Sequence, residues 1–273
     1  MKLAFSSNAF KKSSLEEALD VIAHVGYSGL EIMADIPHAY PPHMPHQRIA
    51  DLKAKIDEYR MAVSNVNAFT LFALGDTYHP TWIESDPVKR EQRIEHTANC
   101  IALAKDLGAK TISLQPGGPL VNMDTPAALQ IYQQGLERLL DIAKQADVVL
   151  LVEPEPGLLI QTSGECVDFL KRVNHPNLKM NCDLGHCYCV GENPARVILD
   201  HSAWIGHVHL EDIAANRVHQ HLIPGRGAMN FTEIFSALKN TGWHGWITVE
   251  LYPYETTAQQ AARESFDFLQ KFI

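Results

Sequence analysis

Short runs of apolar residues recur along the chain, and each is followed by a longer stretch in which apolar residues return every three or four positions. The first pattern predicts a β-strand and the second an amphipathic helix. Near-continuous hydrophobicity within the short runs is typical of parallel strands buried on both faces. Eight strand candidates result, at residues 3–7, 29–33, 62–67, 111–115, 148–153, 179–183, 205–210 and 247–251.

The segments between these candidates have the features of crossover helices. SSLEEALDVIAHVG opens with a serine that can cap a helix and closes with Gly26, a residue type common at helix ends. REQRIEHTANCIALAKDLG and PAALQIYQQGLERLLDIAKQ show the helical period over longer stretches. Further helices are expected at residues 47–59, 164–173, 194–199, 231–239 and 257–272.

A strand followed by a helix, repeated eight times, is the construction of an α/β barrel. The length of 273 residues fits this fold, since such barrels commonly take about 250 residues. No Ser/Gly-rich linker or low-complexity tract interrupts the repeats. We therefore expect an α/β protein with a single (β/α)8 TIM-barrel domain over residues 1–273.

Two segments are too long for the connections of a minimal repeat. Residues 35–46 read DIPHAYPPHMPH, and residues 70–89 read TLFALGDTYHPTWIESDPVK. Both follow strand candidates, so they belong to the mouth of the barrel where active sites of this fold lie. We expect both segments to act as lids over the mouth.

Each of the last four strand candidates ends on a polar residue of a type that binds metals, in VVLLVEPEPG, LKMNCDLGH, IGHVHLED and GWITVELYP. These residues are Glu153, Asp183, His209 and Glu250. Because parallel strands of a barrel all end at one mouth, the four side chains should converge there. We expect His207, on the same strand candidate as His209, to point the opposite way and to have a structural role.

Three carboxylates at one mouth require a positive partner, because unpaired buried charge is costly and neighbouring carboxylates oppose one another's ionisation. No Lys or Arg adjoins the four residues. Three carboxylates and one imidazole suit Mn²⁺ or Mg²⁺, and Zn²⁺ or Co²⁺ also accept these ligand types. We expect one divalent cation, with Mn²⁺ as first choice, and no organic cofactor.

Net charge and composition restrict the classes of molecule that the protein is expected to bind. A formal net charge of −9 argues against a general polyanion-binding surface, because nucleic acids are bound largely through Lys and Arg. The N-terminus reads as a first strand rather than a signal peptide or membrane span. Five cysteines without a CxxC pair suit a reducing compartment. We expect a cytoplasmic protein with a small-molecule sugar or hydroxy-ketone substrate, no nucleic-acid or membrane partner, and a homodimer as an open option.

The strings VEPEPG, CDLGH, HVHLED, PGRGAMNF and TVELYP, in this order, resemble the xylose-isomerase-like TIM-barrel superfamily of sugar isomerases, epimerases and endonuclease IV. The resemblance covers nearly the whole chain. It implies that Glu153, Asp183, His209 and Glu250 are the metal ligands. It also implies that His186, in the DLGH string, faces the substrate or a second metal.

The resemblance to the ketose epimerases of this superfamily implies that Glu153 and Glu250 transfer protons as well as bind the metal. A cation bridging the carbonyl and hydroxyl oxygens of a sugar stabilises the cis-enediolate that forms when a neighbouring proton leaves. Two glutamates on opposite sides of the sugar can then remove a proton from one face and return it to the other face or to the adjacent carbon. The function that the resemblance implies is a metal-dependent ketose isomerase or epimerase.

The resemblance also suggests substrate-binding residues. Arg217 stands where the epimerases hold a substrate hydroxyl, and Glu155 is the glutamate nearest to a further substrate-binding position. Asn67 and Gln115 occupy mouth positions after the third and fourth strand candidates. Together with His186, these residues form the expected substrate-binding set.

Other functions remain open. A dehydratase, or a hydroxypyruvate-type isomerase, acting on a small keto acid or polyol-derived ketone would use the same cation and acid–base pair, and a non-catalytic metal-binding barrel is a further alternative. An abasic-site nuclease is less favoured. His219-Gln220-His221 resembles a nuclease motif, but Asn67 and Gln115 stand where the nuclease has metal-binding histidines. Arg226, in a Gly-Arg-Gly turn, is a candidate for binding a carboxylate or phosphate.

Overall fold

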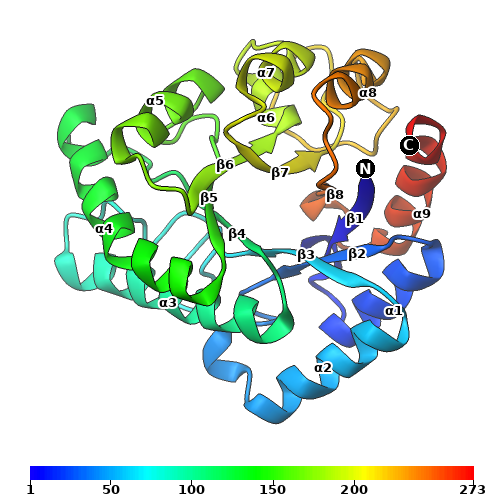
Figure 1. The fold of residues 1–273 in the computed structure, drawn as a ribbon, viewed down its shortest axis with the longest axis horizontal. Helices are drawn as coiled ribbons and strands as arrows, with labels where there is room; N and C mark the ends of the chain where they lie inside the picture. The colour runs from blue at the N-terminus through cyan, green and yellow to red at the C-terminus, as the bar shows by residue number, and fades with distance from the viewer.

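The computed structural model describes residues 1–273 and shows a closed barrel of eight parallel strands in sequence order (Figure 1). Each strand pairs with the next, and β8 pairs with β1 with Leu3 opposite Ile247, which closes the barrel. The strands are β1 (Lys2–Ser6), β2 (Gly29–Met33), β3 (Ala62–Asn67), β4 (Thr111–Leu114), β5 (Val149–Val152), β6 (Leu178–Asp183), β7 (Ile205–Leu210) and β8 (Trp246–Val249). The predicted (β/α)8 TIM barrel is confirmed.

The helices lie around the outside of the strands (Figure 1). None of them combines the length and the apolar character that crossing a membrane requires. The α-helices are α1 (Leu15–Val25), α2 (His46–Glu58), α3 (Pro87–Leu107), α4 (Thr125–Ala146), α5 (Ser163–Val173), α6 (Leu184–Cys189), α7 (Pro194–His201), α8 (Phe231–Asn240) and α9 (Ala258–Leu269). Short 3₁₀ helices are η1 (Ser7–Phe10), η2 (Pro41–His43), η3 (Tyr252–Tyr254) and η4 (Gln270–Phe272).

The boundaries agree closely with those expected from the sequence. β2, β3 and β7 begin and end at the predicted residues, and the other strands differ by one or two residues at an end. Glu153 and Glu250 lie one residue beyond β5 and β8, yet their N–H groups still donate to the carbonyls of Leu114 and Leu210, at 3.1 and 3.2 Å. The strand geometry therefore still fixes the backbone of both glutamates.

Helix α6 was not predicted. It is only six residues long and follows β6 directly, so apolar periodicity has no room to show itself. Asp183 is its N-cap, and the Oδ1 atom accepts a hydrogen bond of 2.7 Å from the His186 N–H. This cap fixes His186 beside the end of β6.

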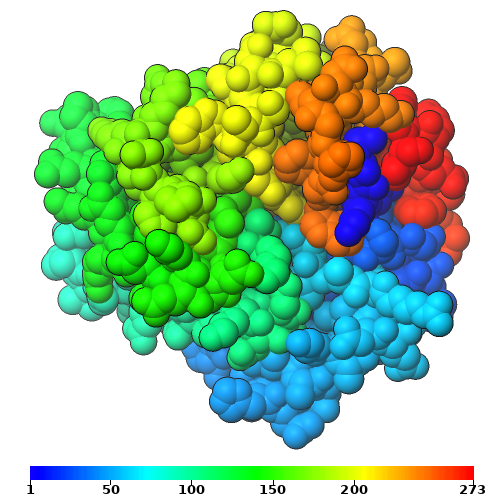
Figure 2. All heavy atoms as spheres, viewed as in Figure 1, coloured from blue at the N-terminus to red at the C-terminus, as the bar shows by residue number.

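The core lies mainly between the strands and the surrounding helices. Buried strand residues such as Leu30, Val66 and Ile112 pack in one cluster with helical residues such as Leu19 and Leu136. The two ends of the chain lie side by side. The N-terminal residues in blue lie between the segment before β8 and the C-terminal helix in red (Figure 2), and the Lys2 N–H donates to the Gly245 carbonyl.

Candidate active site

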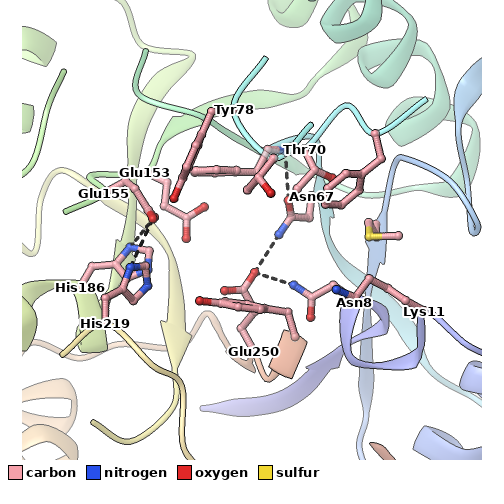
Figure 3. A pocket seen from close by; sticks show the side chains of 15 residues that line it. Asn8, Lys11, Asn67, Thr70, Tyr78, Glu153, Glu155, His186, His219 and Glu250 are labelled. Atoms are coloured by element: carbon pink, nitrogen blue, oxygen red, sulfur yellow. Dashed lines mark hydrogen bonds and ion pairs between the residues drawn. The ribbon is translucent and has the colours of Figure 1, made fainter. Parts of the chain in front are cut away.

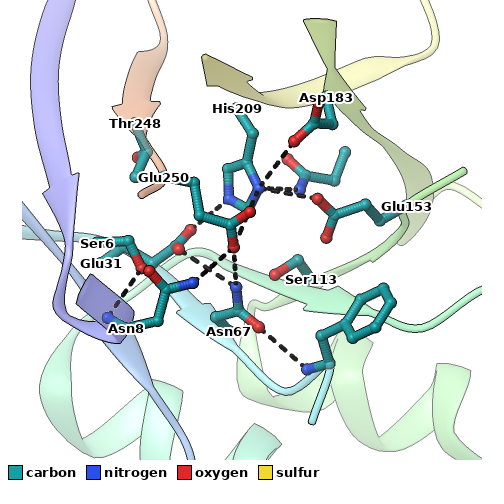
Figure 4. Close-up of polar contacts among 12 residues, drawn as sticks. Ser6, Asn8, Glu31, Asn67, Ser113, Glu153, Asp183, His209, Thr248 and Glu250 are labelled. Carbon is teal, nitrogen blue, oxygen red and sulfur yellow. Dashed lines mark hydrogen bonds and ion pairs between the residues drawn. The ribbon is translucent and has the colours of Figure 1, made fainter. Parts of the chain in front are cut away.

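Glu153, Asp183, His209 and Glu250 converge at the mouth of the barrel, where the sequence placed them (Figure 4). Each offers one ligand atom, and the four atoms lie within 4.8 Å of one another. His209 Nδ1 lies 2.8 Å from Glu153 Oε1 and 3.8 Å from Glu250 Oε1. All four side chains are buried. The four residues thus form one compact cluster of three carboxylates and an imidazole.

The donor set of this cluster fits a divalent cation. The ion pairs of the three carboxylates run only to histidines, never to Lys or Arg. Glu153 Oε2 and Asp183 Oδ2 are buried without any hydrogen-bond partner. Leaving a buried charged oxygen unsatisfied is costly. A cation held by the cluster would satisfy both oxygens and offset the repulsion among the carboxylates.

Two members of the cluster have pKa values raised above their usual range. Burial raises the pKa of Glu250 to about 8. Burial opposes the charged form of His209, but the carboxylates of Glu31 and Glu153 outweigh it and raise the pKa of His209 well above its usual value. A metal binds only the deprotonated nitrogen, so a cation must displace a proton here.

Glu31 on β2 orients His209, and the sequence analysis missed it. Glu31 is fully buried, and its Oε2 lies 2.6 Å from His209 Nε2. Asn65 Nδ2 donates to the same oxygen at 2.9 Å, and Asn67 Nδ2 donates to Oε1 at 3.3 Å. With Nε2–H donating to Glu31, the Nδ1 atom of His209 faces the cluster. Such carboxylate–histidine pairs fix the ring orientation of metal ligands.

Glu31→Gln should weaken binding of Mn²⁺ by about 10- to 100-fold, the usual effect of losing a carboxylate behind a ligating histidine. Glutamine keeps the shape of the side chain, so we expect the barrel to remain folded. Isothermal titration calorimetry with Mn²⁺ measures the change, with the exposed Glu58→Gln as the matched control. Equal affinities for wild type and Glu31→Gln would show that Glu31 is not needed to orient His209.

The direction expected for His207 was wrong, whereas its expected structural role is not contradicted. His207 is buried, lies on the same side of β7 as His209, and has its Nε2 2.8 Å from Thr248 Oγ1. Residues two positions apart on a strand share a face, so His207 had to accompany His209. It lies 3.7 Å from Glu31 and behind the cluster rather than in it.

Glu211, directly after β7, is a second acidic residue that the sequence analysis missed. It offers a ligand atom within 4.8 Å of those of Asp183 and His221, and both its carboxyl oxygens are buried without a hydrogen-bond partner. Burial and the neighbouring Asp183 raise the pKa of Glu211 well above its usual value. The lack of a side chain at Gly185 makes room for it, since a Cβ there would lie 1.6 Å from Glu211 Oε1.

A cavity of about 260 Å³ opens onto the cluster (Figure 3). Two of the expected ligands, Glu153 and Glu250, line it, whereas Asp183 and His209 lie behind them. Asn8 and Asn67 donate to Glu250 Oε1 at 2.8 and 3.1 Å, which fixes the orientation of that carboxylate. The remaining lining residues are Lys11, Met33, Phe69, Thr70, Phe72, Thr77, Tyr78, Glu155, His186, His219 and Tyr252.

His186, Glu155 and His219 form one end of the cavity. His186 Nδ1 lies 3.3 Å from Glu155 Oε2, and His219 Nδ1 lies 3.5 Å from Glu155 Oε1. Burial raises the pKa of Glu155 to about 7. Burial opposes the charge on His186, but Asp183 and Glu155 outweigh it and raise the pKa of His186 to about 9. This end therefore combines hydrogen-bond donors and acceptors that can hold substrate oxygens.

The segment after β3 forms one wall of the cavity, through Phe69, Thr70, Phe72, Thr77 and Tyr78. Asp35 holds its first part, because the Asp35 carboxylate accepts hydrogen bonds from Thr70 Oγ1 and from the N–H groups of Phe72 and Ala73. The segment after β2 contributes no lining residue. Of the two expected lids, the one after β3 therefore lines the cavity.

Two buried side chains hold the far part of this wall. Gln115 Nε2 donates to the Tyr78 carbonyl at 2.9 Å, and Gln115 Oε1 accepts from Thr81 Oγ1. Arg93 donates to the carbonyls of Pro80 and Phe69, at 2.8 and 3.0 Å. Gln115 does not line the cavity. Both ends of its amide hydrogen-bond to the wall, so Gln115 supports the wall, and its expected role in substrate binding stays a prediction.

The structure places two predicted arginines away from the cavity. Arg217 lies in a turn closed by its N–H and the Ala214 carbonyl, and its guanidinium stacks on the Tyr188 ring at 4.4 Å. Arg226 is exposed and pairs with Glu264 at 2.5 Å. Neither lines the cavity. The loops after β7 carry both side chains outward, and the expected roles of these arginines in substrate binding stay predictions.

Asp212 explains the turn that contains Arg226. Its two carboxyl oxygens accept hydrogen bonds from the N–H groups of Gly225, Gly227 and Met229, at 2.9, 2.8 and 3.1 Å. Gly225 has a φ of 90°, in the left-handed region that favours glycine. The PGRG string is thus built to wrap around Asp212 rather than to present an arginine to substrate.

Known proteins similar to this chain share both its fold and much of its length. A family model described as xylose isomerase-like TIM barrel matches residues 10–272. An inosose dehydratase of Lacticaseibacillus casei is 30% identical over 259 residues, which covers 88% of this chain and 83% of the relative.

Solved structures give the same fold at lower identity. An IOLI protein with a bound zinc atom superposes with a TM-score of 0.82 at 21% identity, covering 100% of this chain and 99% of the other. A D-tagatose 3-epimerase-like protein superposes with a TM-score of 0.81 at 22% identity, covering 99% of both chains. At these identities the likeness concerns the architecture of the barrel.

Proposed function

The chain belongs to the xylose isomerase-like TIM-barrel family, and we propose that within it the protein is a metal-dependent ketose isomerase or epimerase. One observation carries the proposal. Glu153 and Glu250 belong to the four-residue cluster and also line the cavity, so each can act on a substrate held beside the cation. In Figure 3 their carboxylates lie on different sides of the cavity.

Glu153, Asp183, His209 and Glu250 would hold the cation. The cation supplies positive charge against the negative charge that develops when a proton leaves the carbon beside a ketone. We keep Mn²⁺ as first choice, with Mg²⁺, Co²⁺ and Zn²⁺ in the test panel, because carboxylate and imidazole ligands serve all four.

The chain's own side chains would move the proton. One of the two glutamates, as carboxylate, takes the proton from the carbon beside the carbonyl, and the other, as carboxylic acid, donates one. Donation to the opposite face of the same carbon gives an epimer. Donation to the adjacent carbon, together with transfer of the hydroxyl proton from one enediolate oxygen to the other, gives an aldose from a ketose. Asn8 and Asn67 hold the Glu250 carboxylate in place for this transfer.

His186 and Glu155 would bind substrate oxygens at the other end of the cavity. Their mutual distance of 3.3 Å keeps the two side chains together, and both line the cavity. Asn67 completes the set on the opposite side, where its Oδ1 accepts from the Phe69 N–H and its Nδ2 donates to Glu250. These contacts support a polar, multiply hydroxylated ligand.

Dehydration is a second candidate, supported by the inosose dehydratase of Lacticaseibacillus casei. A dehydratase begins with removal of the same proton beside a ketone. It then loses a hydroxyl from the next carbon as water, with a proton supplied by an acid. The pair of His186 and Glu155 supplies acid–base groups at the cavity wall for such a leaving hydroxyl.

Product analysis in D₂O separates the two candidates. The Mn²⁺-loaded protein is incubated with ketoses, inososes and keto acids, and the products are followed by NMR and ultraviolet absorbance. Deuterium in an epimer or in an aldose supports the first proposal, whereas loss of water with formation of an unsaturated ketone supports the second. Absence of exchange and of product with all four metals and every substrate would contradict both.

A further inference from the structure

Lys11 and Glu155 lie at different ends of the cavity. Glu153, Glu155 and Glu250 line the part next to the cluster, and two further carboxylates, Asp183 and Glu211, lie behind them. Among the fifteen lining residues, Lys11 is the only Lys or Arg. Figure 3 shows Lys11 beside Asn8, on the far side of Glu250 from His186 and Glu155.

Lys11 is placed by the first turn of chain after β1. Helix η1 follows the strand directly, with Ser6 as its cap, and Lys11 comes at the end of η1. This short helix brings both Asn8 and Lys11 to the cavity. Lys11 is partly buried, whereas its neighbour Lys12 is exposed and does not line the cavity.

The ammonium group of Lys11 has no partner in the protein. Other lysines form ion pairs, as Lys55 does with Asp20 at 2.7 Å and Lys110 with Asp147 at 2.5 Å. The cavity lining also includes the apolar Met33, whose thioether is only a weak hydrogen-bond acceptor. The positive charge is therefore available to a ligand.

We propose that Lys11 binds an anionic group, a carboxylate or a phosphate, at the end of the substrate that lies away from His186 and Glu155. This inference rests on the proposed function and narrows its substrate class to anionic hydroxy-ketones. Such a substrate places its carbonyl and adjacent hydroxyl by the cluster and its anionic substituent on Lys11. Neutral ketoses are then the poorer substrates.

Desolvation gives the physical reason. A bound substrate removes water from a partly buried ammonium group. An ammonium group without a partner then loses its hydration and gains no hydrogen bond in exchange. An anionic substituent restores a charge-assisted hydrogen bond, which is about twice as strong as a neutral one. Because Lys11 is the only Lys or Arg of the lining, pairing of the substituent with Lys11 favours one direction of substrate binding.

Matched pairs of substrates test the inference. Dihydroxyacetone is compared with dihydroxyacetone phosphate and with hydroxypyruvate, and D-fructose with D-fructose 6-phosphate. Solvent-deuterium exchange gives kcat and KM, and calorimetry on the Mn²⁺-loaded protein gives Kd for each compound. We expect tighter binding of the anionic member in at least one pair. The substituent, phosphate or carboxylate, that gives the larger increase in affinity over the neutral compound identifies the preferred anionic group.

Variants at two adjacent lysines provide the control. Lys11→Met should raise KM and Kd for the preferred anionic compound by about 10- to 100-fold, as expected for loss of a hydrogen bond between charged groups. It should change those of the neutral partner by less than about twofold, with little change in kcat for either. Lys11→Arg should retain most of the preference for the anionic compound. Lys12→Met, which removes one positive charge at the adjacent residue, should leave this preference unchanged.

The outcomes separate this inference from the proposed function. Exchange without any preference for anions, or a preference that Lys11→Met leaves unchanged, overturns the role of Lys11 while the proton-transfer function stands. Tighter binding of anions that depends on Lys11, without exchange of any compound, supports Lys11 and counts against the proposed function. Equal binding of every charged and neutral partner by the wild type also overturns the inference.

Discussion

Glu153→Gln and Glu250→Gln each reduce solvent-deuterium exchange into the substrate by about 10²- to 10⁴-fold, the usual contribution of a positioned acid or base. Glutamine keeps a ligand oxygen and the size of the side chain, but it neither accepts nor donates the proton. The measurement is NMR detection of deuterium in recovered substrate and product, at saturating Mn²⁺, with metal content determined for each variant.

The exposed Glu58→Gln serves as control and keeps full exchange. Circular dichroism and thermal unfolding verify that the two active-site variants retain the barrel. Wild-type exchange in either variant, with metal bound, would refute the two-glutamate mechanism. The position of the deuterium label gives a sharper result. Loss of one glutamate should have its largest effect on exchange at the face of the substrate that this glutamate contacts.

Binding of Mn²⁺ to the stripped protein raises the free energy of unfolding by about 2.7 kcal/mol when free Mn²⁺ stands at 100 times its Kd. The gain arises because the cation replaces repulsion among Glu153, Asp183 and Glu250 with attraction, and because it satisfies the two unpartnered buried oxygens. Thermal unfolding with and without Mn²⁺ measures the gain as a rise in Tm of several degrees.

Asp183→Ala and His209→Ala remove a ligand each, so the rise in Tm at the same Mn²⁺ concentration should be lost. Elemental analysis of the purified protein gives an independent check of occupancy. Less than about 0.1 equivalent of metal, together with no shift in Tm from Mn²⁺, Mg²⁺, Co²⁺ or Zn²⁺, would exclude the four-residue metal site.

The cluster was predictable because regular strands position it. Glu153, Asp183, His209 and Glu250 each end an apolar run, and parallel strands bring their ends to one mouth whatever the loops do. Side-chain direction on a strand follows from a period of two residues, and correct use of that period would also have placed His207 with His209.

The positions of Glu31 and Glu211 in the site could not be predicted from the pattern of hydrophobic and polar residues. Glu31 lies within the apolar run GLEIM, so its burial could be predicted, but its partner His209 is 178 residues away. Glu211 stands beside Asp212 in the sequence, yet only Asp212 has its oxygens occupied by backbone N–H groups. Long-range pairing between β2 and β7 depends on the closed barrel, which no local pattern specifies.

Loops were the least predictable part of the site. The family resemblance suggested a substrate-binding role for Arg217 and the Gly-Arg-Gly turn suggested one for Arg226, but turn geometry directs both side chains to the outer surface. Lys11 was not singled out, because a lysine after a first strand has no distinguishing pattern. It reaches the cavity only through the four-residue helix η1, whose presence the sequence did not indicate.

The two anchors of the wall after β3 leave an exposed stretch between them, and the Asp76 carboxylate there accepts hydrogen bonds only from Tyr78 and His79 of the same wall. Asp35 secures the wall up to Ala73, and Gln115 secures it again at Tyr78, whereas Gly75 and Asp76 between them are exposed. Insertions or deletions in this stretch can alter the cover of the cavity without moving a cluster carboxylate. In such a barrel, substrate range and proton-transfer chemistry can diverge independently during evolution, and a library confined to residues 74–77 can recruit new substrates.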